Sequence, residues 1–163
     1  MALCNPISIN DEGELIKLNL GCGLRKIDGY INIDNRYEVN PDVVWNVLDG
    51  FKYADSSVDE VRAFDFLEHI PIGKTVKVVE EIYRVLKPGG KFEHMTPSSD
   101  GRGAFMDPTH VSFWNINSWF YYMVDSYREL YGIKAKFSGE LRDIISDDRH
   151  HIIHTYGVLN AIK

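Results

Sequence analysis

Two glycines and one carboxylate are the residues of this sequence whose types and spacing indicate ligand chemistry. Gly21 and Gly23 follow the apolar segment 17–20, and Asp34 ends a second apolar segment over residues 30–34. In an open α/β sheet both features fall at the carboxyl ends of neighbouring strands, where ligands bind. Glycine lets backbone approach a ligand closely because it has no Cβ, and a carboxylate can accept hydrogen bonds from both hydroxyls of a ribose. The pattern indicates half of a site for a nucleoside-type cofactor, although Gly-x-Gly alone is also typical of a tight turn.

The composition is that of one globular domain with a small acidic excess. The 163 residues are 44% hydrophobic and 26% charged, which suits a single core. A net charge of -6 and the lack of a Lys/Arg cluster argue against a nucleic-acid partner. No apolar run reaches the length of a membrane span, and no signal pattern is present, so we expect no membrane partner. Cys4 and Cys22 make no disulfide framework, which favours reduced thiols and a cytoplasmic protein. We expect an N-terminal arm over residues 1–16 and a single domain over residues 17–163.

Hydrophobic patterning predicts an α/β fold whose first crossover is too short for a full helix. Only residues 24–29 separate the glycines from the second apolar segment, whereas a crossover between parallel strands needs a dozen or more residues. The elements predicted next are strands at 42–47, 58–64 and 91–96 and an amphipathic helix at 72–86. Pro88 and the two glycines after it are expected to end that helix.

The last third of the chain combines a long loop, an aromatic helix and a β-hairpin. Residues 97–115 show no periodicity, and loops of this length are commonly functional. An apolar stripe over residues 116–131 predicts a helix that ends at Gly132 and packs its stripe in the core. Alternation over 133–138 and an apolar run over 150–162, joined by a turn, predict two antiparallel strands.

This layout resembles the class I S-adenosylmethionine-dependent methyltransferases, and within them a group of small predicted methyltransferases. The resemblance covers nearly the whole chain after residue 16. The matching stretches are LNLGCG (18–23), GYINID (29–34), LEH (67–69), RVLKPGG (84–90) and DPTHV (107–111). The resemblance implies a Rossmann-like, seven-stranded, mostly parallel sheet with an antiparallel last strand. It also implies a three-layer sandwich in which the first crossover helix is reduced.

The resemblance also implies which residues bind S-adenosylmethionine. Gly21, Cys22 and Gly23 would lie against its methionine part, with Asn19 close by. Asp34 would hold the ribose hydroxyls. The other implied cofactor residues are Asn35, Asn46, Val47, Asp65 and Phe66, with Asp49 as the alternative to Asn46.

Asn46 departs from the pattern of the family. It stands where those enzymes usually have an acidic residue that binds the adenine amino group. Its amide oxygen still accepts a hydrogen bond, but without a charge.

Methyl transfer from a sulfonium needs mainly proximity and orientation, and it needs a base only where the acceptor must lose a proton. We predict His110, Asp107 and His69 as the catalytic residues, with His94 as a further candidate base. Asp107 equally fits a cap on the turn that follows, with His110 packing. His69 equally fits a structural hydrogen bond at the start of a helix.

The histidine and cysteine pattern does not predict a metal site. His150 and His151 fall on a predicted strand and would point to opposite faces, with His154 beyond them. No Cys/His spacing matches zinc, and Cys22 is interpreted as a small packing residue.

The leading hypothesis is a methyltransferase that acts on a small-molecule or glycan acceptor. No room is left for a separate substrate domain, so residues 1–16, the 97–115 loop and the aromatic helix would form the acceptor pocket. Its expected wall is Arg102, His110, Trp114 and Trp119. A non-catalytic cofactor-binding module and a small NAD-dependent oxidoreductase are the alternatives; the missing third glycine argues against the oxidoreductase. The sequence does not predict the oligomeric state.

Overall fold

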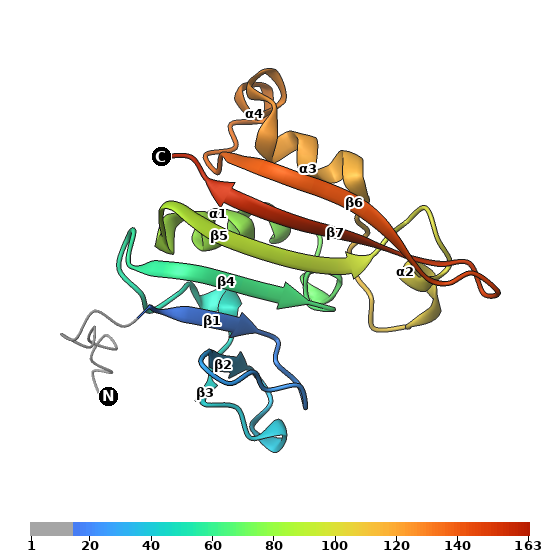
Figure 1. Cartoon of the computed structure of the whole chain (residues 1–163), viewed down its shortest axis with the longest axis horizontal. Coiled ribbons are helices and arrows are strands. Elements are labelled where there is room, and N and C mark those ends of the chain that lie inside the picture. Colours follow the sequence, from blue (N-terminus) through green and yellow to red (C-terminus); the bar gives the residue numbers. More distant parts are fainter. Residues whose placement is uncertain (1–14) are drawn as a thin grey trace.

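Seven strands form one sheet in the order β3-β2-β1-β4-β5-β7-β6 (Figure 1). The computed structural model describes residues 15–163, so the predicted arm lies outside the described residues except for its last two. The strands are β1 (Lys17–Leu20), β2 (Ile31–Asp34), β3 (Val43–Val44), β4 (Val58–Phe64), β5 (Leu86–Pro97), β6 (Phe137–Asp147) and β7 (Ile152–Ala161). β1 to β5 pair in parallel, and β7 is antiparallel to both β5 and β6. The predicted Rossmann-like topology with an antiparallel end is therefore confirmed.

Short helices and turns connect the strands. The helices are α1 (Thr75–Val85), α2 (Gly103–Met106), α3 (Ile116–Met123) and α4 (Asp125–Tyr131), and the 3₁₀ turns are η1 (Tyr37–Val39), η2 (Val47–Asp49) and η3 (Leu67–His69). None of the described helices is long and apolar enough to cross a membrane.

The core lies on one face of the sheet. Val61 of β4 pairs with Phe92 of β5, and both side chains are fully buried. Trp119 of α3 packs on Phe92 with ring centroids 5.8 Å apart, and Tyr83 of α1 packs on Phe137 at 5.5 Å. Because Phe92 and Phe137 also contact each other, α1 and α3 cover the same face.

The opposite face of the sheet has no helical layer among the described residues, which differs from the predicted three-layer sandwich. Residues 21–30 and 35–42, which connect β1 to β2 and β2 to β3, contain no α-helix. Both connections are shorter than a helical crossover requires. The prediction that the first crossover helix is reduced is confirmed, and the reduction extends to the second crossover.

Several predicted boundaries moved because tertiary pairing overrides local pattern. The segment predicted as a strand over 42–47 keeps only β3, since its second half turns into η2. The predicted helix at 72–86 is α1, which ends at Val85, before the proline. The strand predicted at 91–96 is β5, whose pairing with β4 starts already at Leu86.

The predicted helix over 116–131 is broken into α3 and α4. Val124 between them adopts an extended conformation with φ −102° and ψ 119°. α4 ends as expected at Gly132, which is left-handed with φ 66°. The hairpin strand predicted from residue 133 begins only at Phe137, where pairing with β7 begins.

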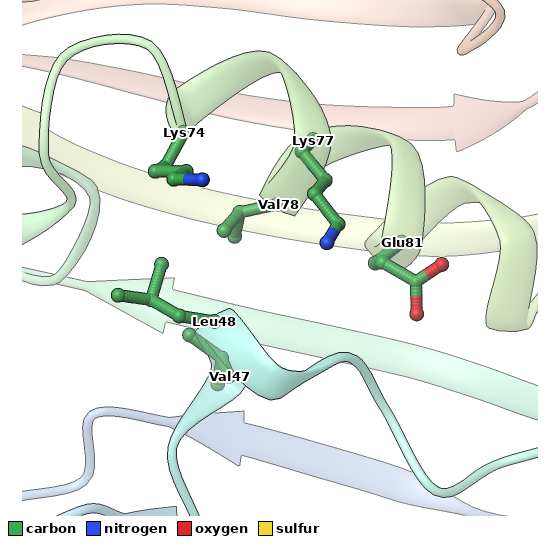
Figure 2. A pocket seen from close by; sticks show the side chains of 6 residues that line it. All are labelled: Val47, Leu48, Lys74, Lys77, Val78 and Glu81. Atoms are coloured by element: carbon green, nitrogen blue, oxygen red, sulfur yellow. The ribbon is translucent and has the colours of Figure 1, made fainter.

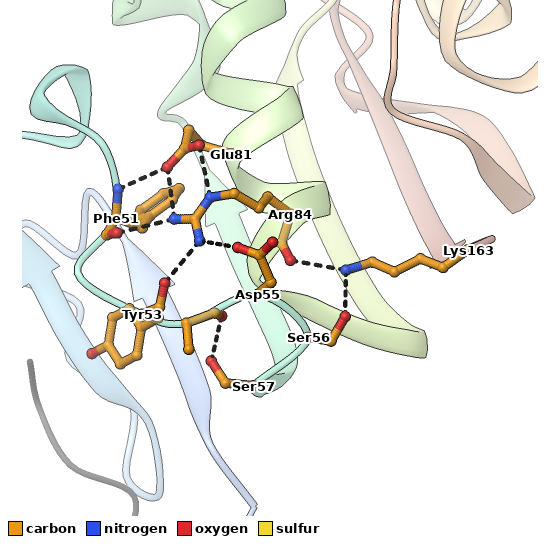
Figure 3. A network of polar contacts seen from close by, with 9 residues as sticks. Phe51, Tyr53, Asp55, Ser56, Ser57, Glu81, Arg84 and Lys163 are labelled. Atoms are coloured by element: carbon orange, nitrogen blue, oxygen red, sulfur yellow. Dashed lines mark hydrogen bonds and ion pairs between the residues drawn. The ribbon is translucent and has the colours of Figure 1, made fainter.

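A cluster of hydrogen bonds around Arg84 fixes the chain between η2 and β4 to α1 (Figure 3). Arg84 donates to both carboxylate oxygens of Glu81, at 2.8 and 2.9 Å, and to Asp55 at 2.7 Å. It also donates to the backbone carbonyls of Phe51 and Tyr53. Since η2 precedes this segment, the cluster anchors one wall of the site described next.

Candidate functional site

A pocket of about 410 Å³ lies at the carboxyl ends of the first four strands, and we name it the strand-end pocket. Its wall includes seven of the residues predicted to bind a cofactor: Gly21, Asp34, Asn35, Asn46, Val47, Asp65 and Phe66. The remaining lining residues are Ile33, Arg36, Trp45, Leu48, His69, Ile70, Pro71 and Thr109. Residues from four strand ends therefore meet in one cavity, as expected for a ligand site of an open α/β sheet.

Gly21 begins the loop over residues 21–23, which we name the glycine loop, and holds its backbone close to the ring of Phe66. Its φ is 61°, a left-handed value that favours glycine. A Cβ on this residue would lie 2.5 Å from Cδ2 of Phe66. Only glycine therefore lets β1 end against the Phe66 ring, and both residues line the strand-end pocket.

Asp34 ties the glycine loop to the end of β2. Oδ2 accepts the backbone N–H of Gly23 at 2.9 Å, and Oδ1 accepts the backbone N–H of Arg36 at 2.9 Å. The side chain is only 6% exposed. A carboxylate has about four acceptor sites, so Asp34 can stabilise the loop and still accept hydrogen bonds from a ligand in the pocket.

Asn19, Cys22 and Gly23 support the loop from behind and do not line the pocket. Asn19 donates to the side chain of Asn32 at 2.9 Å, and the Cys22 N–H donates to the Ile33 carbonyl at 3.1 Å. Burial raises the pKa of the Cys22 thiol. These contacts agree with the interpretation of Cys22 as a packing residue.

The η2 turn supplies the wall opposite the glycine loop. The Asn46 side-chain oxygen accepts the backbone N–H of Leu48 at 3.0 Å, which leaves one lone pair for a ligand. Asp49, the alternative to Asn46, is not among the lining residues. Trp45, which the sequence reasoning missed, lines the pocket and donates its indole N–H to Gly50 at 2.7 Å.

The back of η2 packs on α1, and Figure 2 shows Val47 and Leu48 facing Val78 there. The cavity between them is about 10 Å³, and Lys74, Lys77 and Glu81 complete its wall. A space of this size is close to the lower limit for one water molecule. It separates two packed elements and is too small for a cofactor.

Asp65 lies in a strained conformation at the end of β4. Its φ is 48°, which is uncommon for a residue other than glycine. Its backbone N–H donates to Met95, and its carboxylate lies 3.5 Å from Arg25 and 3.7 Å from His154. Strain of this kind concentrates at ligand sites, and Asp65 lines the strand-end pocket.

The three predicted catalytic residues come close together, but only His69 lines the strand-end pocket. The rings of His69 and His110 meet edge to face at 5.1 Å. Asp107 lies 3.9 Å from His110 and accepts hydrogen bonds from the N–H and hydroxyl of Thr109, which lower the pKa of Asp107. His94 lies elsewhere, fully buried under Trp119.

A second, more open cavity of about 520 Å³ adjoins this cluster, and we name it the aromatic pocket. Its lining residues are Ile72, Thr75, Val76, Ser112, Phe113, Trp114, Ser118, Tyr121, Tyr122, Tyr131 and Ile133. Of the predicted acceptor wall, only Trp114 is among them. Trp119 is fully buried and stacks on Trp114 with centroids 5.3 Å apart. The expectation that Trp119 faces an acceptor is corrected, because its ring packs on Phe92 and His94 of β5.

Comparison with known proteins agrees with this geometry. Residues 28–93 match the family model described as a methyltransferase domain, and no curated protein sequence matches the chain. A SAM-dependent methyltransferase from Archaeoglobus fulgidus shares the fold with a TM-score of 0.63 at 15% identity, over 91% of this chain and 86% of that one.

Two further structures share the fold. The Burkholderia thailandensis 1,6-didemethyltoxoflavin-N1-methyltransferase, with bound 1,6-didemethyltoxoflavin and S-adenosylhomocysteine, gives a TM-score of 0.64 at 10% identity, over 91% of this chain and 71% of that one. A complex of the Haloferax volcanii Trm112 methyltransferase activator with a methyltransferase gives 0.66 at 15% identity, over 92% of this chain and 83% of that one. The chain therefore has the fold of S-adenosylmethionine-dependent methyltransferases, and residues 28–93 match a methyltransferase domain.

Proposed function

We propose that the protein transfers the methyl group of S-adenosylmethionine to a small-molecule or glycan acceptor, with the cofactor in the strand-end pocket. The observation that carries this proposal is the meeting of Gly21, Asp34 and Asn46 in one cavity. In this pose the ribose lies at Asp34, the adenine beside Asn46 and Val47, and the methionine part against Gly21 and Phe66. The pose follows the chemistry of these groups. The Asp34 carboxylate can accept from both ribose hydroxyls, the Asn46 amide oxygen can accept from the adenine amino group, and Gly21 lets the backbone approach the methionine part closely.

The aromatic pocket is the place we propose for the acceptor. It adjoins the strand-end pocket through two segments, since residues 69–71 and Thr109 line one and Ile72 and residues 112–114 line the other. Tyrosine and phenylalanine side chains suit a planar ring or the apolar face of a sugar. The Burkholderia thailandensis structure, whose bound small molecule lies with the cofactor product, supports an acceptor of this size.

His69, which lines the strand-end pocket, and His110, whose ring contacts that of His69, are our candidates for removing a proton from the acceptor. His69 is exposed and reaches the pocket wall. Asp107 acts with them only indirectly, because its carboxylate is engaged by Thr109. We propose no nucleic-acid partner, because the chain carries a net charge of -6. We keep the cytoplasm as the proposed compartment.

The proposal is tested by thermal unfolding with S-adenosylhomocysteine. The ligand is expected to raise the melting temperature of the wild-type chain, because it binds only the folded state. Asp34→Ala is expected to abolish the shift. Asp28→Ala, which removes an exposed carboxylate from the connection between β1 and β2, is the control and is expected to keep the shift. No shift of the wild type at millimolar ligand contradicts the proposal.

The same assay separates the two alternatives. A shift with NADH in place of S-adenosylhomocysteine would favour an oxidoreductase. A shift with S-adenosylhomocysteine, but no methylated product from any acceptor in a panel of phenols, amines and sugars, would favour a non-catalytic binding module.

A further inference from the structure

Glu68, a buried residue beside the strand-end pocket, has a carboxylate oxygen without a hydrogen-bond partner among the described residues. Glu68 is 1% exposed and follows Leu67 in η3. Its Oε2 accepts the hydroxyl of Thr96 at 2.7 Å. Its Oε1 is buried and has no hydrogen-bond partner among the described residues. A buried carboxylate oxygen without a partner is costly, so this atom marks a position where a cation or donor is missing.

Two imidazoles lie close to the Glu68 carboxylate. One side-chain ligand atom each from Glu68, His69 and His110 lies within 4.8 Å of the other two. Two ligands of one tetrahedral zinc ion lie about 3.4 Å apart, given zinc–ligand bonds of about 2.1 Å. Binding an ion would therefore draw these side chains together by up to about 1.4 Å, a change that His69 can make because it is exposed.

The hydrogen bonds of both histidines involve Nδ1 and not Nε2; Nε2 of His110 lies 3.9 Å from Oδ2 of Asp107, beyond hydrogen-bond distance. Nδ1 of His110 lies 3.0 Å from the carbonyl oxygen of Ala104, and Nδ1 of His69 lies 3.3 Å from that of Thr109. A carbonyl oxygen only accepts, so Nδ1 carries the proton in each neutral ring and Nε2 keeps its lone pair. A backbone carbonyl behind the ring is the usual support of a metal-binding histidine.

Backbone contacts hold the cluster together across a long sequence separation. The N–H groups of Val111 and Ser112 donate to the Glu68 carbonyl at 2.9 and 3.0 Å. The Ser112 hydroxyl donates to the carbonyl of Leu67 at 2.8 Å. These bonds fix the 110–112 segment against η3, so the backbone that carries the three side chains is held in place before any ligand arrives.

We propose that Glu68, His69 and His110 bind a divalent transition-metal ion at the wall of the strand-end pocket. Two imidazoles and one carboxylate suit zinc, iron or cobalt, whereas magnesium prefers an all-oxygen set. This proposal departs from the expectation of no metal, which considered only Cys/His spacing and not ligands that come from two segments and include a glutamate.

The role of the ion deepens the proposed function and rests on it. Because His69 lines the pocket, the ion would hold an acceptor hydroxyl and make it more acidic. The oxygen gives its proton to solvent and forms a bond to the methyl carbon. The carbon–sulfur bond of the sulfonium breaks, which leaves S-adenosylhomocysteine. An ion in this position would replace imidazole as the means of activating the acceptor.

The test is titration of the chelator-treated full chain with Co²⁺ and Zn²⁺ in the absence of cofactor and acceptor. The wild type is expected to bind one ion and to develop the visible ligand-field bands of Co²⁺. His110→Asn and His69→Asn are expected to weaken binding at least tenfold, and Glu68→Gln to do the same. His150→Asn is the matched control, because His150 also follows an aspartate at i−3, on the exposed β6–β7 turn.

Absence of binding by the wild type, or equal binding by His110→Asn and His150→Asn, overturns the metal site. Mg²⁺ that binds as tightly as Zn²⁺ overturns the transition-metal assignment. If Glu68→Gln does not fold, as judged by circular dichroism, the two histidine variants decide. The rise in melting temperature with S-adenosylhomocysteine is measured on the same metal-free protein. If that rise is absent but metal binds, the proposed function is contradicted and the metal site is not.

Discussion

Gly21 and Phe66 form the contact on which the glycine loop depends. The Phe66 ring occupies the space of a Cβ at Gly21, and the backbone of Gly21 is left-handed. Gly21→Ala is therefore expected to combine backbone strain with steric overlap and to lower affinity for S-adenosylhomocysteine at least tenfold, as isothermal titration would show.

Gly29→Ala separates these two effects. Gly29 is also left-handed, with φ 78°, but nothing lies within 4 Å of a Cβ added there. Gly29→Ala, the control, is expected to lower the free energy of unfolding by about 1 kcal/mol through backbone strain alone. Its affinity for S-adenosylhomocysteine is expected to stay that of the wild type. Equal loss of affinity in both variants would contradict the role of the Phe66 contact.

At the residue scale, sequence could predict the groups that a motif places at a strand end. Gly21 and Asp34 were predicted because an apolar run stops at each of them, and Asn46 was predicted from the family resemblance. Trp45 and Glu68 were missed, since an aromatic residue in a strand and a glutamate in a turn are typical of packing and of solvent exposure. Their positions at the site follow from contacts between distant segments, which spacing along the chain does not contain.

At the scale of elements, Arg84 joins α1 to the segment that leads from η2 to β4. Arg84→Ala is expected to lower the free energy of unfolding by about 2–4 kcal/mol, because it removes the guanidinium that donates to the carbonyls of Phe51 and Tyr53 and leaves Glu81 with only the Phe51 N–H as a donor among the described residues. Arg84→Lys is expected to recover only part, since lysine cannot donate to both oxygens of Glu81 in fork geometry. Urea unfolding measures both.

Arg149→Ala, on the exposed β6–β7 turn, is the control for this prediction. It is expected to change the urea midpoint little. A similar midpoint for Arg84→Ala and Arg149→Ala would mean that the cluster in Figure 3 does not stabilise the fold.

The two halves of the predicted aromatic helix differ in what they bury. Trp119 in α3 is fully buried, whereas Leu130 in α4 is 73% exposed. Trp119→Ala is expected to cost about 3–5 kcal/mol of unfolding free energy, and Leu130→Ser less than about 0.5 kcal/mol. A cost for Leu130→Ser as large as that for Trp119→Ala would show that α4 continues the core stripe. Periodicity could not reveal the break, because both halves carry apolar residues at helical spacing.

At the scale of the whole molecule, the sheet is covered on one face and polar on the other. On the face that carries no helix among residues 15–163, the Nζ atoms of Lys17 and Lys91 lie 3.7 and 2.7 Å from carboxylate oxygens of Glu60. The guanidinium of Arg62 lies over the Phe64 ring at 3.8 Å. Charged side chains with apolar stems let this face meet water without a helical layer. The family resemblance implied the mostly parallel sheet with its antiparallel end, but it also implied three layers, so the missing layer was not predicted.

His94, on the helix-covered face of the sheet, is expected to make the free energy of unfolding depend on pH. Burial lowers the pKa of His94 to about 3, and its ring stacks on Trp119 at 3.8 Å. The unfolded chain binds a proton at this residue near pH 6.5, whereas the folded chain does not. Stability contributed by the neutral ring is therefore lost as pH falls from 6.5 toward 3.

The measurement is the difference in unfolding free energy between pH 7.5 and pH 5.0. His94 is expected to account for about 2 kcal/mol of the loss, at about 1.4 kcal/mol per unit of pH below 6.5. His94→Phe is expected to remove that part of the pH dependence. An unchanged difference in this variant would mean that the imidazole is not buried in its neutral form.

The central claim is that the strand-end pocket holds the methyl donor, and a crystal structure with S-adenosylhomocysteine tests it most directly. The account predicts ribose hydroxyls within hydrogen-bond distance of Asp34, the adenine beside Asn46 and the sulfur next to Gly21. Ligand density in any other cavity, or an Asp34 carboxylate that contacts only Gly23 and Arg36 in the complex, would contradict it.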